Sequence, residues 1–252
     1  MRRATVLGLL GAVLVVGIGA YTAFWWVAAQ KIEEAATAWR ESARAQKIDA
    51  SWQTMRVAGY PFSLRLELGD VVVKDAATTP PAEFGAPLLS ASVSPWNFHR
   101  LWFAAPDGLN AAAGPEALAF AKLSAARGSG AAAFTADGTA AIWLTLYQAK
   151  AEAGLAVGAR AVNAWAIVPA SPPASHQDPG FGLAADIRDL TLPAAPAGFK
   201  PAIDDLGFGL TMMGAFPPGP LRQAAAAWRD AGGTVELDHL LLRWGDMEIN
   251  GS

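Results

Sequence analysis

The sequence contains no cysteine and only three histidines among its 252 residues. Without cysteine there is no disulfide framework, no thiol nucleophile and no cysteine-based zinc or iron–sulfur site, so an exported domain must rely on its own apolar core. The net charge is small, at -3, and no basic patch stands out. Nucleic-acid binding therefore has no electrostatic support, and we expect no nucleic-acid partner.

Motifs of the common catalytic classes are also missing from the sequence. The histidines, His99, His176 and His239, are scattered, and none belongs to a His-Glu-x-x-His zinc motif. The chain has no Gly-x-Ser-x-Gly nucleophile elbow and no phosphate-binding P-loop. We therefore expect a protein that is not an enzyme, with no catalytic residue, no cofactor and no metal.

The chain does have a long apolar segment at its start, because residues 4–28 carry no charge. A helix needs about 20 apolar residues to cross a bilayer core of roughly 30 Å, so this segment is long enough. Arg2 and Arg3 precede it, and positive residues favour the cytoplasmic side. The far end carries aromatic residues typical of a membrane interface: Tyr21, Phe24, Trp25 and Trp26. We predict a transmembrane anchor at residues 1–29, with a cytoplasmic N-terminus and the rest exported.

A cleavable secretory signal peptide is the alternative interpretation of the same segment. Signal peptides also combine a basic start, an apolar stretch of about 7–15 residues and a small-residue cleavage site. Residues 17–20 (Gly-Ile-Gly-Ala) could form such a site, but the apolar segment continues beyond Ala20 into the aromatic cluster. The anchor is therefore favoured, and both interpretations export the remainder of the chain.

The region after the anchor changes from a helical to an alternating pattern. Residues 31–47 have apolar side chains at three- and four-residue spacing, which predicts a stalk helix continuing out of the membrane. Residues 62–68 place Phe and Leu on one side and Ser, Arg and Glu on the other, as in a half-buried strand. A turn at residues 58–61 joins this strand to another at residues 52–57, so the two predict a hairpin.

Alternating segments then repeat along the rest of the chain, at residues 89–93, 130–136, 140–151, 181–187, 206–212, 234–243 and from 247 onward. Residues 155–168 fit a strand or a short helix, and the strand is favoured. Residues 221–231 predict a second helix that Gly232-Gly233 ends. We expect an α+β fold: a transmembrane helix and a stalk helix, then a large, twisted, mostly antiparallel sheet with one or two packed helices.

A loop rich in proline and serine at residues 169–180 is the clearest break in this pattern. We predict the stalk helix and a first β-rich lobe at residues 30–168, and a second β-rich lobe at residues 181–252. The sequence stops inside a strand pattern at residues 250–252. Because an unpaired edge strand is an unfavourable terminus, we expect the second lobe to be truncated.

The densest aromatic and polar cluster is Trp-Asn-Phe-His-Arg-Leu-Trp at residues 96–102. In one interpretation, a strand end packs its tryptophan into the core. In the other, amphipathic rings form a binding rim that contacts a ligand or the membrane surface. The segment 140–151 is apolar on both faces, which predicts a strand that is central or covered on both sides. The candidate rim residues are Trp96, Phe98, Trp102 and Trp143.

The segment at residues 59–66 (Gly-Tyr-Pro-Phe-Ser-Leu-Arg-Leu) resembles a hairpin motif of a Gram-negative bacterial family of unknown function, numbered 2125 among such domains. Residues 94–97 (Ser-Pro-Trp-Asn) and 240–245 (Leu-Leu-Leu-Arg-Trp-Gly) resemble it as well. The family has no assigned reaction. A more distant similarity is to AsmA-like envelope proteins, in which repeated strands form a curved sheet with an apolar interior implicated in lipid traffic. That similarity implies a fold and transfers no catalytic residue.

Two hypotheses about function remain open. The first is an inner-membrane-anchored periplasmic protein that binds or handles lipid on an apolar sheet face. The second is a structural or protein-interaction component of the cell envelope, with an open strand at residues 247–252 that pairs with an envelope protein. The expected partners are thus the membrane, lipid and an envelope protein. An open apolar groove would favour the first, and a sheet filled by its own helices the second.

Overall fold

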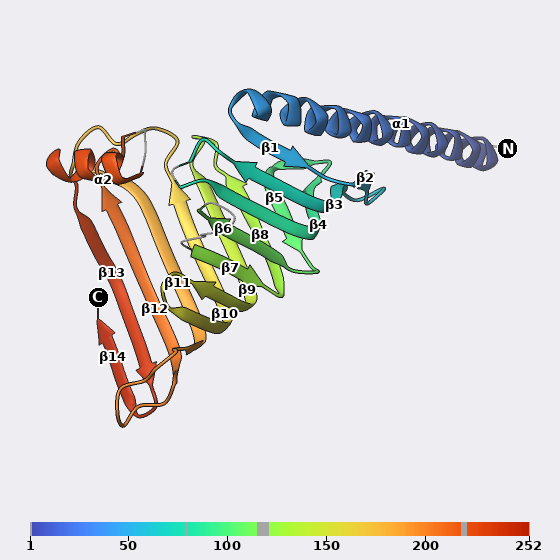
Figure 1. Cartoon of the computed structure of the whole chain (residues 1–252). Helices are drawn as coiled ribbons and strands as arrows, with labels where there is room; N and C mark the ends of the chain where they lie inside the picture. Colours follow the sequence, from blue (N-terminus) through green and yellow to red (C-terminus); the bar gives the residue numbers. More distant parts are fainter. Residues whose placement is uncertain (1, 79, 115–120, 218–220, 252) are drawn as a thin grey trace.

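The computed structural model describes residues 2–78, 80–114, 121–217 and 221–251. Helix α1 (Arg2–Ala45) is one continuous helix of 44 residues, so the predicted anchor and stalk form a single rod (Figure 1). A large antiparallel sheet follows, together with helix α2 (Leu221–Asp230). The predicted fold class is confirmed.

The strands account for most of the described chain. They are β1 (Ile48–Ser51), β2 (Thr54–Ala58), β3 (Leu64–Asp75), β4 (Ala82–Ser94), β5 (Asn97–Ala105), β6 (Leu109–Ala113), β7 (Ala121–Ala125), β8 (Arg127–Phe134), β9 (Ala140–Glu152), β10 (Ala156–Val168), β11 (Pro179–Thr191), β12 (Ala202–Met213), β13 (Val235–Trp244) and β14 (Met247–Gly251). Among the described residues they form one sheet in the order β1-β3-β4-β5-β8-β9-β10-β11-β12-β13-β14, with β2 beside β3.

The short strands β6 and β7 continue the lines of β5 and β8. Strand β4 pairs with β5 through Ser90–Ser94 and with β6 through Ala82–Gly85. Strand β9 pairs with β8 and then with β7 in the same way. The sheet is therefore an antiparallel meander of long strands, two of which are interrupted. Residues 169–178, which make up most of the predicted loop, join β10 to β11, and since these strands pair, the regions on either side share one sheet.

The long strands bend where two consecutive residues point to the same side. In β9, Leu146 and Ala149 lie in one buried cluster, while Tyr147 and Gln148 between them are exposed. Gln148 has a positive φ of 50°, which interrupts the alternation of the strand. The other long strands bend at matching positions, where two inner-side residues are also three positions apart. These residues are Leu68/Val71, Ala86/Leu89, Ala159/Val162, Ile187/Leu190 and Ile203/Leu206.

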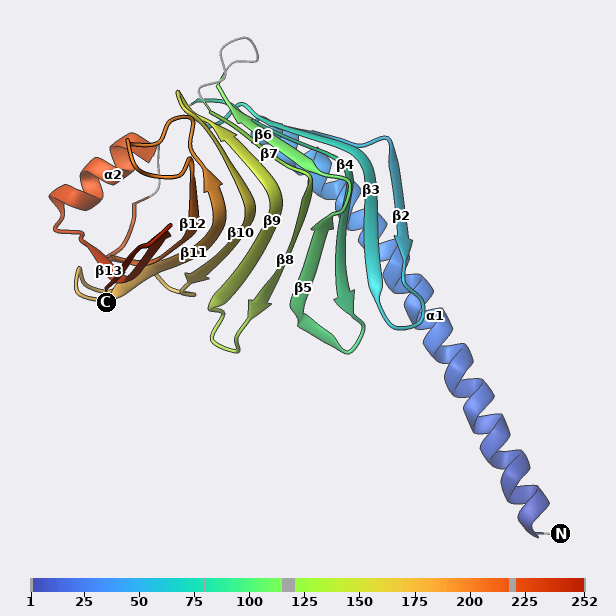
Figure 2. The same ribbon diagram turned by 90° about the horizontal axis from the view of Figure 1, so that it is seen from below.

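These bends give the sheet two different faces. We call the side that holds Leu146 and Ala149 the inner face, and the side that holds Tyr147 and Gln148 the outer face. At each bend two consecutive residues point to the outer face, so the strand curves toward the inner face. Figure 2 shows this curvature in the middle of the sheet. The alternation shifts by one residue at each bend, and the apolar residues after the bend therefore face the same side as those before it.

The two helices lie at the borders of the sheet. Helix α1 packs against β1, β2 and β3, where Ala43 and Ala50 are almost fully buried. Helix α2 lies at another border, and Trp228 Nε1 donates a hydrogen bond to the Met213 carbonyl at 2.9 Å (Figures 1 and 2). In the described part of the chain, neither helix packs extensively against β8 or β9. Neither α1 nor α2 as the structure describes them therefore covers the middle of the inner face.

Candidate binding surface

A continuous apolar row crosses the inner face from one border toward the other. Paired positions place these residues side by side: Leu66, Ala91, Phe103, Gly130, Leu144, Ala164, Ala185, Phe208 and Leu240. Gly130 is required there, because a Cβ would lie 2.3 Å from Cζ of Phe103 and 2.3 Å from the Trp143 carbonyl oxygen. Most of the large side chains are half-buried, since only the curvature of one layer shields them.

A hollow of about 450 Å³ lies beyond the bend. A second row of paired residues lines it: Val73, Phe84, Ala111, Leu123 and Ala151, from β3, β4, β6, β7 and β9. At its end the next inner-face row is Asp75, Ala82, Ala113 and Ala121, so one carboxylate lies beside an otherwise apolar lining. An apolar lining with a polar group at one end suits an amphipathic ligand.

A larger hollow of about 840 Å³ lies between α2 and the opposite ends of the strands. Its apolar lining includes Val168, Phe181, Met212 and Trp228. Met212 lies four positions after the inner-face residue Phe208 on β12 and therefore points to the same side. This hollow thus opens on the inner face. Both volumes fall in the range of roughly 300–1,000 Å³ usual for small-molecule sites.

The outer face carries a different hollow, of about 640 Å³, that is more polar. Trp102 and Trp143 both line it, and Ala131 separates them in the paired strands β5, β8 and β9. Arg65 and Arg100 also line it, with the Arg100 guanidinium carbon 5.6 Å from the centroid of the Trp102 ring. This distance allows a cation–π contact.

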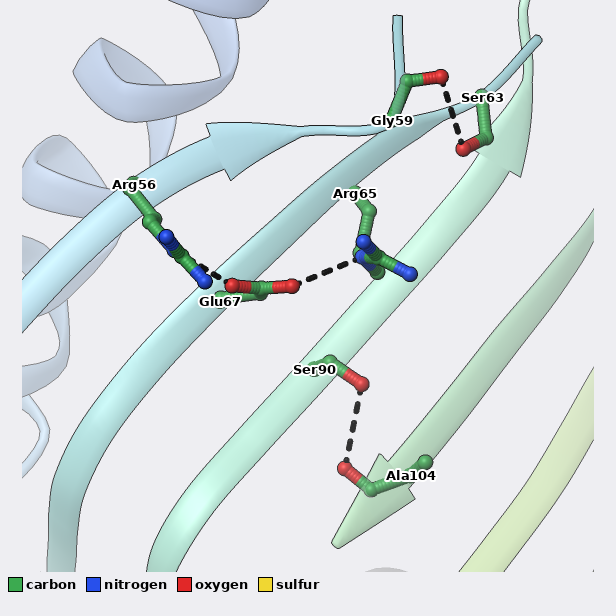
Figure 3. Close-up of polar contacts among 7 residues, drawn as sticks. All are labelled: Arg56, Gly59, Ser63, Arg65, Glu67, Ser90 and Ala104. Atoms are coloured by element: carbon green, nitrogen blue, oxygen red, sulfur yellow. Dashed lines mark hydrogen bonds and ion pairs between the residues drawn. The ribbon is translucent and has the colours of Figure 1, made fainter. Parts of the chain in front are cut away.

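Ion pairs and hydrogen bonds tie neighbouring strands together on the outer face. Glu67 accepts from Arg56 Nε at 2.6 Å and pairs with Arg65 Nε at 2.9 Å (Figure 3). Farther along the sheet, Arg160 pairs with Asp189, and the hydrogen bond and charge of that carboxylate raise the pKa of Arg160. The Arg56–Glu67 pair joins β2 to β3 and the Arg160–Asp189 pair joins β10 to β11, whereas Arg65 and Glu67 lie on the same strand.

The structure separates the four predicted rim residues into two places. Trp102 and Trp143 meet in the outer hollow, whereas Trp96 and Phe98 lie at the β4–β5 turn and the start of β5 and are exposed. The rim itself stays a prediction. Sequence reasoning missed the inner-face hollows, which include Phe84, Leu123 and Trp228. Alternation in single strands signals an apolar face, but the hollows depend on register between strands far apart in sequence.

The histidines are also apart in the fold. His99 lies near the start of β5, His176 in the loop before β11, and His239 on β13 beside Gly209. Among the described residues, no group of three or more His, Cys, Asp or Glu side chains could hold a metal ion.

Fold and surface together define a class: a β-rich protein with a curved, half-open sheet and an N-terminal helix whose length and composition suffice to cross a membrane. The chain belongs to the family of uncharacterised proteins conserved in bacteria, DUF2125, whose family model matches residues 25–252. The family resemblance seen in the sequence is thereby confirmed. Neither the curated proteins nor the solved structures contain a match to this chain.

Proposed function

We propose that this protein binds or handles lipid on the inner face of its sheet, as a non-catalytic protein held to the inner membrane by α1. The single observation that carries the proposal is the uncovered apolar row across the middle of the sheet. A sheet filled by its own helices would argue against lipid binding, but both helices lie at the borders. The two hollows on this face add space for an acyl chain.

The proposed topology has a cytoplasmic N-terminus and a periplasmic sheet. Arg2 and Arg3 precede the apolar segment, and Lys31 on the other side is accompanied by Glu33 and Glu34. The excess of positive charge before the segment supports this orientation.

Lipid binding can be tested by purifying the full chain in mild detergent and measuring co-purified lipid by mass spectrometry. A fluorescent fatty acid, cis-parinaric acid, serves as the added probe. The Ala111→Trp variant places an indole in the 450 Å³ hollow, and we expect it to lower probe binding without introducing a polar group. Ala133→Trp, at an outer-face position paired with Arg100, is the matched control and should bind like the wild type. Absence of both co-purified lipid and probe binding would contradict the proposal.

A second candidate function is an envelope scaffold that pairs with another protein. Strand β14 forms the border of the sheet and pairs on one side with β13 in the described chain. An exposed strand edge can accept a strand from a partner. Cross-linking in intact cells from a photo-reactive residue at Ile249 should then yield one defined adduct. A ladder of unspecific products, or none, would remove this candidate.

A further inference from the structure

Two turns of the sheet lie against the membrane-side half of α1. The β2–β3 turn carries Tyr60 and Phe62, and the β4–β5 turn carries Trp96. Figure 1 shows β2 and β3 beside α1. We call these two turns, with the adjoining Phe98, the aromatic turns. Several contacts fix their position: the Tyr21 hydroxyl donates to the Pro61 carbonyl, Thr22 Oγ1 lies 2.8 Å from the Tyr60 hydroxyl, and Trp25 Nε1 donates to the Ser63 carbonyl at 3.0 Å.

Ring contacts join the second turn to the same level of the helix. The ring centroid of Tyr21 lies 6.2 Å from that of Trp96 and 6.3 Å from that of Tyr60. Tyr21 thus contacts both turns, and the helix before it extends away from the sheet (Figure 2). The level of the turns relative to the bilayer therefore follows from the number of α1 residues between the start of the membrane span and Tyr21.

That count places the aromatic turns at the bilayer surface. An α-helix rises about 1.5 Å per residue, so about 20 residues cross a hydrocarbon core of roughly 30 Å. Counted from Ala4, the first residue after the arginine pair, such a span ends near Ala23. Tyr21 lies within the last turn of this span, and the side chains at its level meet the interface between acyl chains and headgroups.

The exposed side chains of the turns have the chemistry of an interface. Phe62 is 72% exposed, Trp96 66% and Phe98 59%, although all three are large and aromatic. Residues 94–102 include His99 and Arg100 and no aspartate or glutamate. Aromatic rings with basic neighbours are enriched where proteins meet a lipid surface.

We propose that the aromatic turns insert into the outer surface of the same bilayer that α1 crosses, so that the sheet rests on the membrane. This inference rests on α1 spanning the bilayer and does not require lipid on the inner face. It has one consequence for that face. Leu64, the first inner-face residue of β3, follows Phe62 by two positions. The apolar face therefore begins at the membrane surface.

The absence of cysteine allows a direct test, because one introduced cysteine labels one position. The full chain is reconstituted in vesicles of phosphatidylcholine and phosphatidylglycerol that contain a lipid with a nitroxide on its acyl chain. The variants Phe62→Cys and Trp96→Cys carry an environment-sensitive dye. Leu155→Cys is the matched control, since Leu155 is 68% exposed in the β9–β10 turn, at the other end of the strands. Val16→Cys, on the apolar part of α1, reports whether the helix spans.

We expect the dye at positions 16, 62 and 96 to emit at shorter wavelength and to be quenched by the nitroxide lipid, and the dye at position 155 to show neither effect. Quenching at position 16 with none at 62 and 96 would overturn the insertion of the turns while leaving the anchor intact. Absence of quenching at position 16 would overturn both. Lipid binding on the inner face is measured separately, so its failure would not mimic either result.

Discussion

The inner and outer faces of the sheet are formed by the same strands but are stabilised differently. The inner face uses apolar burial, with Leu64 only 2% exposed and an uninterrupted apolar row across the middle. The outer face uses ion pairs between partly solvated side chains of neighbouring strands, such as Arg56–Glu67 and Arg160–Asp189. The difference shows how a one-layer sheet can remain apolar on one side: curvature shields that side, while polar contacts hold the strand register on the other.

The largest expected effect lies on the inner face. Leu64→Ala truncates the largest fully buried side chain among the described residues, and such changes cost about 2–5 kcal/mol of unfolding free energy. Phe62→Ala, two positions earlier and exposed, is the control and should cost less than about 0.5 kcal/mol. Urea unfolding of the full chain in detergent micelles measures both. Equal losses would mean that the buried Leu64 stabilises the fold no more than an exposed side chain beside it.

The bend between the faces gives the next effect. Gln148 has a positive φ of 50°, which a β-branched side chain adopts poorly, so Gln148→Val should cost about 1–2 kcal/mol. Gln148→Gly should leave stability unchanged, because glycine adopts this conformation freely. Lys150→Val, two residues along the same strand, is the matched control and is expected to change unfolding free energy by less than about 0.5 kcal/mol. Equal unfolding free energies for Gln148→Val and Lys150→Val would contradict the expectation that a β-branched residue strains the backbone at the bend.

The smallest effect belongs to the outer face. Glu67→Gln removes the carboxylate that pairs with Arg56 and Arg65, and since both arginines are substantially exposed we expect a loss of about 0.5–1 kcal/mol. The loss should shrink in high salt, because screening weakens such pairs. Glu83→Gln, whose Oε2 lies 3.9 Å from Lys74 Nζ, is the control and should have almost no effect. A loss of unfolding free energy that does not change with salt would show that Glu67 stabilises the sheet by packing and not by its charge.

Much of the fold could be predicted because its signals are local. Alternation gave most of the strands, and the pattern at residues 221–231 gave α2. Apolar residues on both faces of residues 140–151 indicated a strand that is central or covered on both sides, and β9 lies between β8 and β10. Its outward residues are nevertheless uncovered, with Trp143 and Tyr147 exposed, because the sheet is a single layer.

The candidate surface was harder to predict because it depends on long-range pairing. Trp102 and Trp143 lie 41 positions apart in sequence and share one hollow only because β5, β8 and β9 pair in register. The bend at Gln148 has no glycine or proline to signal it, and simple alternation would place Ala149 on the outer face. Local patterns carry no information on either point.

The long apolar start of α1, the alternating strands and the absence of cysteine chemistry can be read from the chain alone, since each depends on neighbouring residues or composition. The folded molecule was needed to show that the bends line up across the sheet, that the inner face remains continuous and apolar through them, and that two aromatic turns lie beside Tyr21. Register and curvature arise from contacts between strands, and one strand cannot specify how its neighbours align.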